Sequence, residues 1–230
     1  MLDKFAVIGM GQFGFRVAKQ LTVKGAEVLA IDKDIDRVEM IKDDVTYAVA
    51  LDSTDIKALS SQNLQEMDAV LVAIGENIEG LLLTTVLLLE LNIKRIVARA
   101  MSQQQRLILE KLGVKEILSP EDEVGLMVAE LMLNPTMKAF LPLPDNYEIA
   151  EIQVPKKICT KIVEEIDFEG NYNLRLITIK RVYEEMAQNQ MKKVEHLVQK
   201  INRNTIIEPS DMLIVMGKSG DVEKFIYLNS

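Results

Sequence analysis

The residues best suited to chemistry lie near the start of the chain, in the stretch VIGMGQFGFRVAKQL at positions 7–21. Gly9, Gly11 and Gly14 form the pattern G-x-G-x-x-G between a short apolar run and a helical pattern. The first glycine permits a tight turn, the second leaves room for a pyrophosphate, and the third allows close packing of helix on sheet. Backbone N–H groups at the helix start can then bind phosphate oxygens. The stretch therefore predicts a nucleotide-binding loop; the alternative is a loop that serves only the turn.

An acidic residue follows at the spacing that such a site requires. Asp32 ends the second apolar run, EVLAID, about 20 residues beyond the glycines, where a carboxylate accepts hydrogen bonds from ribose hydroxyls. Strand, glycine loop, helix, strand and acid thus occur in the order of a nucleotide-binding unit. This order makes the motif more specific than the three glycines are by themselves.

Other candidate residues end later apolar runs, because ligands of an open parallel sheet bind at the carboxyl ends of its strands. Asp52, Ser53 and Thr54 in LDSTD could contact the base; alternatively, one of the hydroxyl residues caps the next helix. Arg99 could face phosphate or form a surface ion pair. The complete candidate set for nucleotide binding is Gly9, Met10, Gly11, Gln12, Phe13, Gly14, Asp32, Lys33, Arg37, Asp52, Ser53, Thr54, Ala73, Ile74, Gly75, Asn77 and Arg99.

The elements that must hold these residues alternate regularly over the first 120 positions. Apolar runs predict strands at KFAVIG, EVLAID, TYAVAL, DAVLVAIG, RIVARA and EILSP, and helical patterns lie between them near residues 12–24, 34–43, 54–62, 77–92 and 102–112. Strands that are apolar on both faces indicate a parallel sheet, and parallel strands need crossover helices. The sequence therefore predicts an α/β fold with a Rossmann-like, doubly wound parallel sheet of about six strands.

A segment marked by prolines separates this domain from the rest. Pro142 and Pro144 stop the helical pattern and stiffen the chain. We therefore expect a nucleotide-binding domain at residues 1–140, ending in a crossover helix, and a smaller α+β lobe at residues 141–230. In the lobe, YEIAEIQVP, NLRLITIKRV and PSDMLIVMG predict strands, KICTKIVEEI predicts a helix, and a short helix ends the chain.

The apolar helical patterns at residues 81–91 and 124–133 have almost no charged face. A helix on the surface of one sheet needs a polar face. Residues 124–133 are therefore either enclosed within one chain or packed against a second subunit. The proline-marked connector at residues 141–145 is a candidate hinge.

Composition excludes several classes of protein. The chain has 230 residues, 48% of them hydrophobic, and a net charge of −8, so it can bury a core but does not favour nucleic acid. One cysteine, Cys159, excludes an internal disulfide and a cysteine-built metal site. The longest apolar stretch, at residues 80–93, is shorter than the ~18 to 20 residues of a bilayer span. We expect a cytoplasmic protein that does not insert into the membrane directly.

Catalytic groups are not evident. A nicotinamide enzyme needs a proton donor or acceptor beside the reacting carbon, and the one histidine, His196, lies in the charged segment KKVEHLVQK, as expected for a surface residue. Cys159 has no histidine near it in the sequence. We therefore expect a nucleotide sensor that is not an enzyme. The alternatives are a small NAD(P)-dependent oxidoreductase and a nucleotide- or redox-responsive scaffold.

Several stretches resemble one known family. FAVIGMGQFGFRVAKQL, EVLAIDKDIDRVEMI, AVALDSTD, VLVAIGENIEGLLLTTVLLLEL and ILEKLGVKEILSPEDEVG are similar to the regulatory subunits of bacterial potassium uptake systems of the Trk/Ktr type, whose nucleotide-binding domain is called RCK or KTN. PSDMLIVMG resembles the companion RCK C-terminal domain. The likeness covers essentially the whole chain and is strongest over residues 4–133.

The resemblance implies a homo-oligomer, in which dimers assemble into a tetramer or octameric ring, beneath a membrane potassium-translocating subunit on the inner face of the cell membrane. ATP, ADP, NAD or NADH in the crevice would change the ring's shape and gate the pore. It also implies that Glu121 helps to bind a divalent cation, Mg or Ca, between subunits, and some relatives bind cyclic di-AMP in the small lobe. Gln12 stands where Ktr-type relatives commonly have an arginine beside the terminal phosphate, so a preference for ATP does not follow. Residues that match the family's nucleotide contacts are Gly9, Gly11, Gly14, Asp32, Asp52 and Thr54, and more loosely Lys33 and Arg99.

Overall fold

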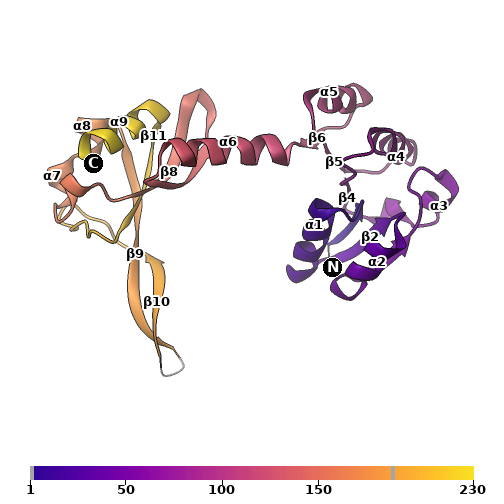
Figure 1. Ribbon diagram of the computed structural model, residues 1–230, viewed down its shortest axis with the longest axis horizontal. Helices are drawn as coiled ribbons and strands as arrows, with labels where there is room; N and C mark the ends of the chain where they lie inside the picture. Colours follow the sequence, from indigo (N-terminus) through magenta and orange to yellow (C-terminus); the bar gives the residue numbers. More distant parts are fainter. Residues whose placement is uncertain (1–2, 188–189) are drawn as a thin grey trace. The chain divides into compact units, whose positions relative to one another are not determined.

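The computed structural model describes residues 3–187 and 190–230. These residues form two compact units, divided between Glu123 and Val124 (Figure 1). Each unit has its own sheet; the first has a hydrophobic core on each face of its sheet, and the second has one core.

The sheet of the first unit has six strands, all of them parallel. They are β1 (Lys4–Ile8), β2 (Glu27–Asp32), β3 (Tyr47–Ala50), β4 (Ala69–Val72), β5 (Ile96–Arg99) and β6 (Glu116–Leu118). Their order is β3-β2-β1-β4-β5-β6, which is the Rossmann order that the alternating pattern predicted. Because β1 pairs with both β2 and β4, the strand order reverses beside β1.

Helices cover both faces of this sheet, as the doubly apolar strands predicted. They are α1 (Gln12–Val23), α2 (Ile35–Ile41), α3 (Ile56–Ser60), α4 (Ile78–Glu90) and α5 (Gln103–Leu112), with short 3-10 turns η1 (Lys42–Asp44) and η2 (Leu64–Glu66). Successive strand side chains point to opposite faces. Val7 accordingly packs in one core with Ala18 of α1, whereas Ile8 packs in the other with Leu81 of α4.

The crossover helix α6 (Pro120–Leu133) runs through the division between the two units. The contacts divide the chain at Glu123, earlier than the boundary at residue 140 that the prolines indicated. Residues beyond α6 form β7 (Met137–Pro142), which pairs with β8 (Tyr147–Gln153) in the second sheet. Pro142 fits there because β7 is an edge strand, where a missing N–H is tolerated.

The second unit is an antiparallel sheet with short helices, which confirms the predicted α+β lobe. Its strand order is β10-β9-β11-β8-β7. The long strands β9 (Arg175–Ala187) and β10 (Gln190–Leu197) form an extended hairpin (Figure 1). The remaining elements are β11 (Met212–Lys218), η3 (Pro144–Asn146), η4 (Lys156–Ile158), α7 (Val163–Ile166), α8 (Phe168–Tyr172) and α9 (Ser219–Asn229).

The prediction of a single helix at KICTKIVEEI is wrong. The structure has the short turn η4 and then α7, separated by Thr160, whose φ of 67° lies in the left-handed region. A residue with that backbone conformation interrupts a right-handed helix. Cys159 lies at the end of η4 and is partly buried.

An ion pair with a fully buried carboxylate links β9 to the residue before β11 in the second unit. Asp211 has no exposed surface, and Arg181 of β9 donates from Nε and Nη2 to its two carboxylate oxygens, at 2.8 Å each. The backbone N–H of Glu208 also donates to Asp211, at 2.8 Å. Fork-to-fork pairing of this kind fixes geometry as well as charge. Asp211 also raises the pKa of Arg181.

Replacing Asp211 by alanine should destabilise the second unit by about 3–5 kcal/mol, because two charge-assisted bonds from Arg181 and one from the N–H of Glu208 would be lost. Arg181 would keep only its ion pair with Glu208 and its bond to the Ile206 carbonyl oxygen. Urea unfolding of the full chain, followed by circular dichroism, measures this loss. Glu164→Ala is the matched control, because Glu164 forms only an exposed pair with Arg203 at 3.6 Å. Equal losses in the two variants would contradict the assignment.

Candidate functional site

The candidate residues converge at the carboxyl ends of the parallel strands, beside the reversal of strand order. The backbone N–H of Gly9 donates to Ile31 of β2 at 2.7 Å, which joins the loop after β1 to β2. The side chain of Arg99, at the end of β5, lies over the Phe13 ring of α1, 5.0 Å from its centroid. Ligands of open parallel sheets bind at this edge, where the order reverses.

Two of the three motif glycines are required by the fold itself. Gly9 has a φ of 100°, and a Cβ there would lie 3.1 Å from the backbone of Ala73 and Ile74. A Cβ on Gly14 would clash with the carbonyl oxygen of Gly9. These two positions therefore serve the turn and the close approach of α1 to β1.

Gly11 is different, because nothing in the described chain requires a glycine there. Its φ of −66° suits any residue, and a Cβ would meet no described atom within 4 Å. The glycine therefore leaves open space in front of the start of α1. Room at this point is what a bound pyrophosphate needs.

The start of α1 is also uncapped, whereas α2 to α5 each have a side-chain cap. Gly11 is the N-cap residue of α1, and no side chain of the described residues accepts a hydrogen bond from its first turn. The caps of the other four helices are Asp34, Asp55, Asn77 and Ser102. The unpaired N–H groups and the positive end of the helix dipole favour an anion.

Asp32 is buried beside the glycine loop and bonded to it. Its Oδ2 accepts from the backbone N–H of Met10 at 2.6 Å, and its Oδ1 accepts from that of Asp34 at 2.9 Å. Arg37 lies 3.7 Å from Oδ2. Because each carboxylate oxygen has two lone pairs, Asp32 retains acceptor capacity for a ribose hydroxyl. Lys33 is exposed next to it.

Within the LDSTD segment, Asp52 is exposed, whereas Ser53 is buried. Asp52 accepts hydrogen bonds from the backbone N–H and hydroxyl of Thr54, at 2.9 and 2.7 Å, and these bonds lower the pKa of Asp52. The hydroxyl of Ser53 is buried and bonded to that of Thr84 in α4 at 2.7 Å, so it supports packing. The alternative in which Ser53 or Thr54 caps the next helix is wrong, because Asp55 caps α3.

The opposite wall follows β4. Ala73 is buried, Ile74 packs against the core, and Asn77 caps α4 by accepting from the N–H of Gly80 at 3.0 Å. A Cβ on Gly75 would lie 2.6 Å from the Sδ of Met101. Met101 was not among the predicted residues, although its position two residues after β5 is a usable signal.

Arg99 joins the crevice to the first turn of α6. It forms an ion pair with Glu121, which lowers the pKa of that carboxyl group, and its side chain is 14% exposed. Its Nε is buried without a hydrogen-bond partner among the described residues. Arg99 thus forms an ion pair, one of its two predicted roles, and its guanidinium keeps an unused donor. Contact with phosphate, the other role, stays a prediction.

The remaining candidates lie at the surface. Gln12 and Arg37 are exposed. His196 is exposed, as predicted, and its ring lies 5.8 Å from that of Tyr183. Within residues 3–187 and 190–230, no group of three or more acidic, histidine or cysteine side chains is arranged to hold a metal ion. The metal role of Glu121 therefore stays a prediction.

In the same two ranges, none of the helices combines the length and the hydropathy that a membrane span requires.

Comparison with known proteins gives consistent matches. Residues 5–120 match the TrkA-N domain family. The chain is 31% identical over 225 residues to the Ktr system potassium uptake protein C of Bacillus subtilis (strain 168), which covers 98% of this chain and 96% of that protein. The family match lies within the first unit, whereas the match to the uptake protein extends over nearly the whole chain.

Solved structures share the fold. The GsuK RCK domain matches with a TM-score of 0.63 at 14% identity. The match covers 100% of this chain and 48% of the GsuK chain. The GsuK channel bound to NAD matches with a TM-score of 0.62 at 13% identity. That match covers 100% of this chain and 40% of the channel chain.

The named relatives are a potassium uptake protein and the RCK domain of a channel, not enzymes. This agrees with the expectation of a non-catalytic protein. The chain therefore belongs to the TrkA-N family and is a relative, over nearly its whole length, of the Ktr potassium uptake proteins.

Proposed function

We propose that this chain is a cytoplasmic regulatory subunit of a Ktr-type potassium uptake system, and that it senses an adenine nucleotide, ATP, ADP, NAD or NADH. The observation that carries the proposal is the open, uncapped start of α1 at Gly11. A diphosphate bound there would meet the N–H groups of residues 11–14. The NAD in the related channel structure supports the same class of ligand.

The sugar and base would extend from this point toward β2 and β3. Asp32 would accept from the ribose hydroxyls, with Arg37 and Lys33 beside it to offset the phosphate charge. Asp52 and Thr54 mark the outer edge of the crevice, where they would meet the adenosine. On this reading Ser53 acts indirectly, through its bond to Thr84.

Arg99 is the proposed link between ligand and movement. A phosphate at the start of α1 would compete with Glu121 for the guanidinium, which already offers a buried, unpaired Nε. Release of Glu121 would alter the first turn of α6, the helix that continues into the second unit. A ligand can shift such an equilibrium only by binding one state more tightly.

Assembly would follow from α6. Val124, Leu126 and Val128 are exposed by 45–53%, and Met132 and Leu133 by more than 75%. We infer that a second copy covers this apolar surface, and that dimers assemble into a tetramer or an octameric ring at the inner face of the cell membrane, against a potassium-translocating subunit. A divalent cation, Mg or Ca, at Glu121 and cyclic di-AMP in the small lobe are further proposals that rest on the family resemblance.

A thermal-shift panel of ATP, ADP, NAD and NADH on the full chain tests the proposal. At least one should raise the melting temperature, because a ligand at 100 times its Kd stabilises the native state by about 2.7 kcal/mol. Co-purification with a Ktr-type membrane subunit and nucleotide-dependent potassium uptake would then separate a transport regulator from a scaffold. No shift with any of the four nucleotides would contradict the sensor assignment.

Gly11→Val should abolish nucleotide binding while leaving the chain folded, because the added side chain would enter the space reserved for phosphate. The expected cost in folding free energy is only about 1 kcal/mol, from a poorer N-cap residue. Gly14→Ala is the contrasting variant: it should cost more than about 2 kcal/mol of stability, since the Cβ meets the Gly9 carbonyl oxygen. Calorimetry with ADP and thermal unfolding measure the two effects, and retained binding in Gly11→Val would locate the phosphates elsewhere.

Asp32→Asn should weaken ADP by about 1.5–3 kcal/mol, the range for a hydrogen bond to a charged group. Inorganic pyrophosphate, which has no sugar, should lose much less affinity. Titration of both ligands into wild type and variant separates the two roles of Asp32. Equal losses for ADP and pyrophosphate would mean that Asp32 acts only by holding the glycine loop.

A further inference from the structure

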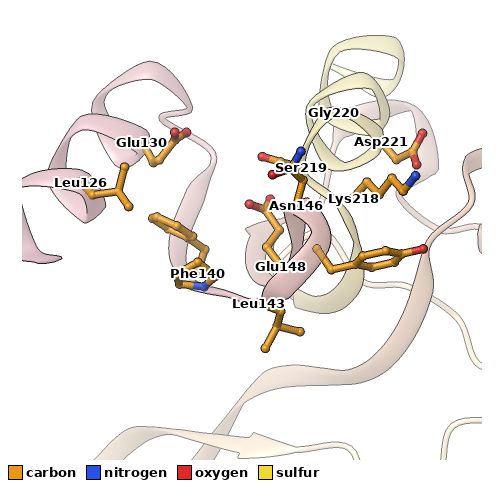
Figure 2. Close-up of a pocket in the computed structure, with 12 residues that line it drawn as sticks. Leu126, Glu130, Phe140, Leu143, Asn146, Glu148, Lys218, Ser219, Gly220 and Asp221 are labelled. Atoms are coloured by element: carbon orange, nitrogen blue, oxygen red, sulfur yellow. The ribbon is translucent and has the colours of Figure 1, made fainter. Parts of the chain in front are cut away.

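A cavity lies within the second unit, apart from the proposed nucleotide crevice. It has a volume of about 480 Å³, within the range of small-molecule sites. Its walls come from α6, the β7–β8 hairpin and the start of α9, and Figure 2 shows the side chains around it. The lining includes the apolar residues Leu126, Phe140, Pro142 and Leu143.

The acidic group of this cavity is unusual because it is buried and incompletely bonded. Glu148 of β8 is only 6% exposed, and its Oε1 has no hydrogen-bond partner within the described part of the chain. Burial of the carboxyl group raises the pKa of Glu148, Glu130 and Glu223 raise it further, and a hydrogen bond with Ser219 opposes the shift. A buried, unpaired carboxylate is costly to maintain.

The charges around Glu148 favour a cation. Glu130 and Asp221 also line the cavity, and Lys218 is the one basic residue in the lining. Lys218 lies over the Tyr147 ring, 5.9 Å from its centroid, and Figure 2 shows its side chain extending away from Glu148. The start of a helix can attract an anion. At α9, however, the carboxyl group of Glu148 already occupies this place, bonded to Ser219.

The shape and lining distinguish an organic cation from a metal ion. None of the acidic, histidine or cysteine clusters within residues 3–187 and 190–230 has the arrangement that a metal needs. The volume is also far larger than one ion, and Leu126, Phe140 and Leu143 provide apolar surface. An ammonium group on a short aliphatic chain matches both features, since its charge can pair with a carboxylate while its methylene groups contact the apolar wall.

We propose that this cavity binds a small aliphatic amine, whose ammonium group pairs with Glu148 and whose hydrocarbon part contacts the apolar wall from α6 and β7. Glu130, on the α6 side, provides a second carboxylate for a diamine. The cavity belongs to the second unit alone, so the proposal does not depend on the nucleotide crevice.

The test uses 1,4-diaminobutane as probe, titrated into the full chain by calorimetry at constant ionic strength. We expect saturable binding, with at least tenfold weaker affinity for Glu148→Gln. Glu164→Gln is the matched control, because it removes the same charge from an exposed position in the same unit. This variant should bind 1,4-diaminobutane as tightly as the wild type does. Butan-1-ol, which has the same apolar body without the charge, should not bind.

A second variant keeps the test independent of folding defects. Leu143 lies on the cavity wall outside α6 and is partly exposed, so Leu143→Lys should fold, supply an ammonium group from the chain itself, and prevent diamine binding. Unchanged diamine affinity in both Glu148→Gln and Leu143→Lys would overturn the proposal. Displacement of the diamine by equimolar KCl or MgCl₂ would overturn the assignment to organic amines.

Discussion

The bond between the N–H of Met10 and the carboxylate of Asp32 is the contact on which the rest of the first unit's chemistry depends. It joins the loop after β1 to the end of β2, and so sets the direction in which α1 starts. Gly9 has a positive φ, and Gly14 lies so close to the carbonyl oxygen of Gly9 that a Cβ would clash with it. The loop therefore has little conformational freedom. The uncapped N–H groups of α1 are consequently held in place without a ligand, which would lower the ordering cost of binding the proposed nucleotide.

The two units use charge in opposite ways. In the first unit, Arg99 contacts the Phe13 ring and pairs with Glu121, while its Nε has no hydrogen-bond partner among the described residues. Its contacts can therefore change at modest cost. In the second, Arg181 and Asp211 satisfy each other with two bonds of equal length, an arrangement that resists change. The proposed sensor would need both kinds of contact. A ligand can redistribute only contacts that are not already optimal, and the rest of the chain must stay rigid enough to transmit the change.

Most of the first unit was predictable because its signals are local and repeated. Six apolar runs, each followed by a helical pattern, define the parallel sheet, and G-x-G-x-x-G with Asp32 locates the crevice. Two contacts that the sequence did not reveal join distant residues: the bond of Ser53 to Thr84 and the pairing of Arg99 with Glu121. The cap from Asp55 is local, but three neighbouring residues could each have capped the helix, and sequence does not choose among them. In the second unit, Thr160 adopts a left-handed conformation within an apparently helical pattern, and propensity alone gives no warning of that.

The pairing of β7 with β8 has a practical consequence for dissecting the protein. A fragment ended at residue 140 would cut through β7, leaving unpaired backbone groups on both pieces and an exposed edge on the remaining sheet, a common cause of aggregation. Separately produced halves would be better divided within α6, near Glu123, so that the edge strand stays with its neighbours. The apolar surface of that helix would then travel with the C-terminal piece, and solubilising substitutions at Met132 and Leu133 would be the first to introduce.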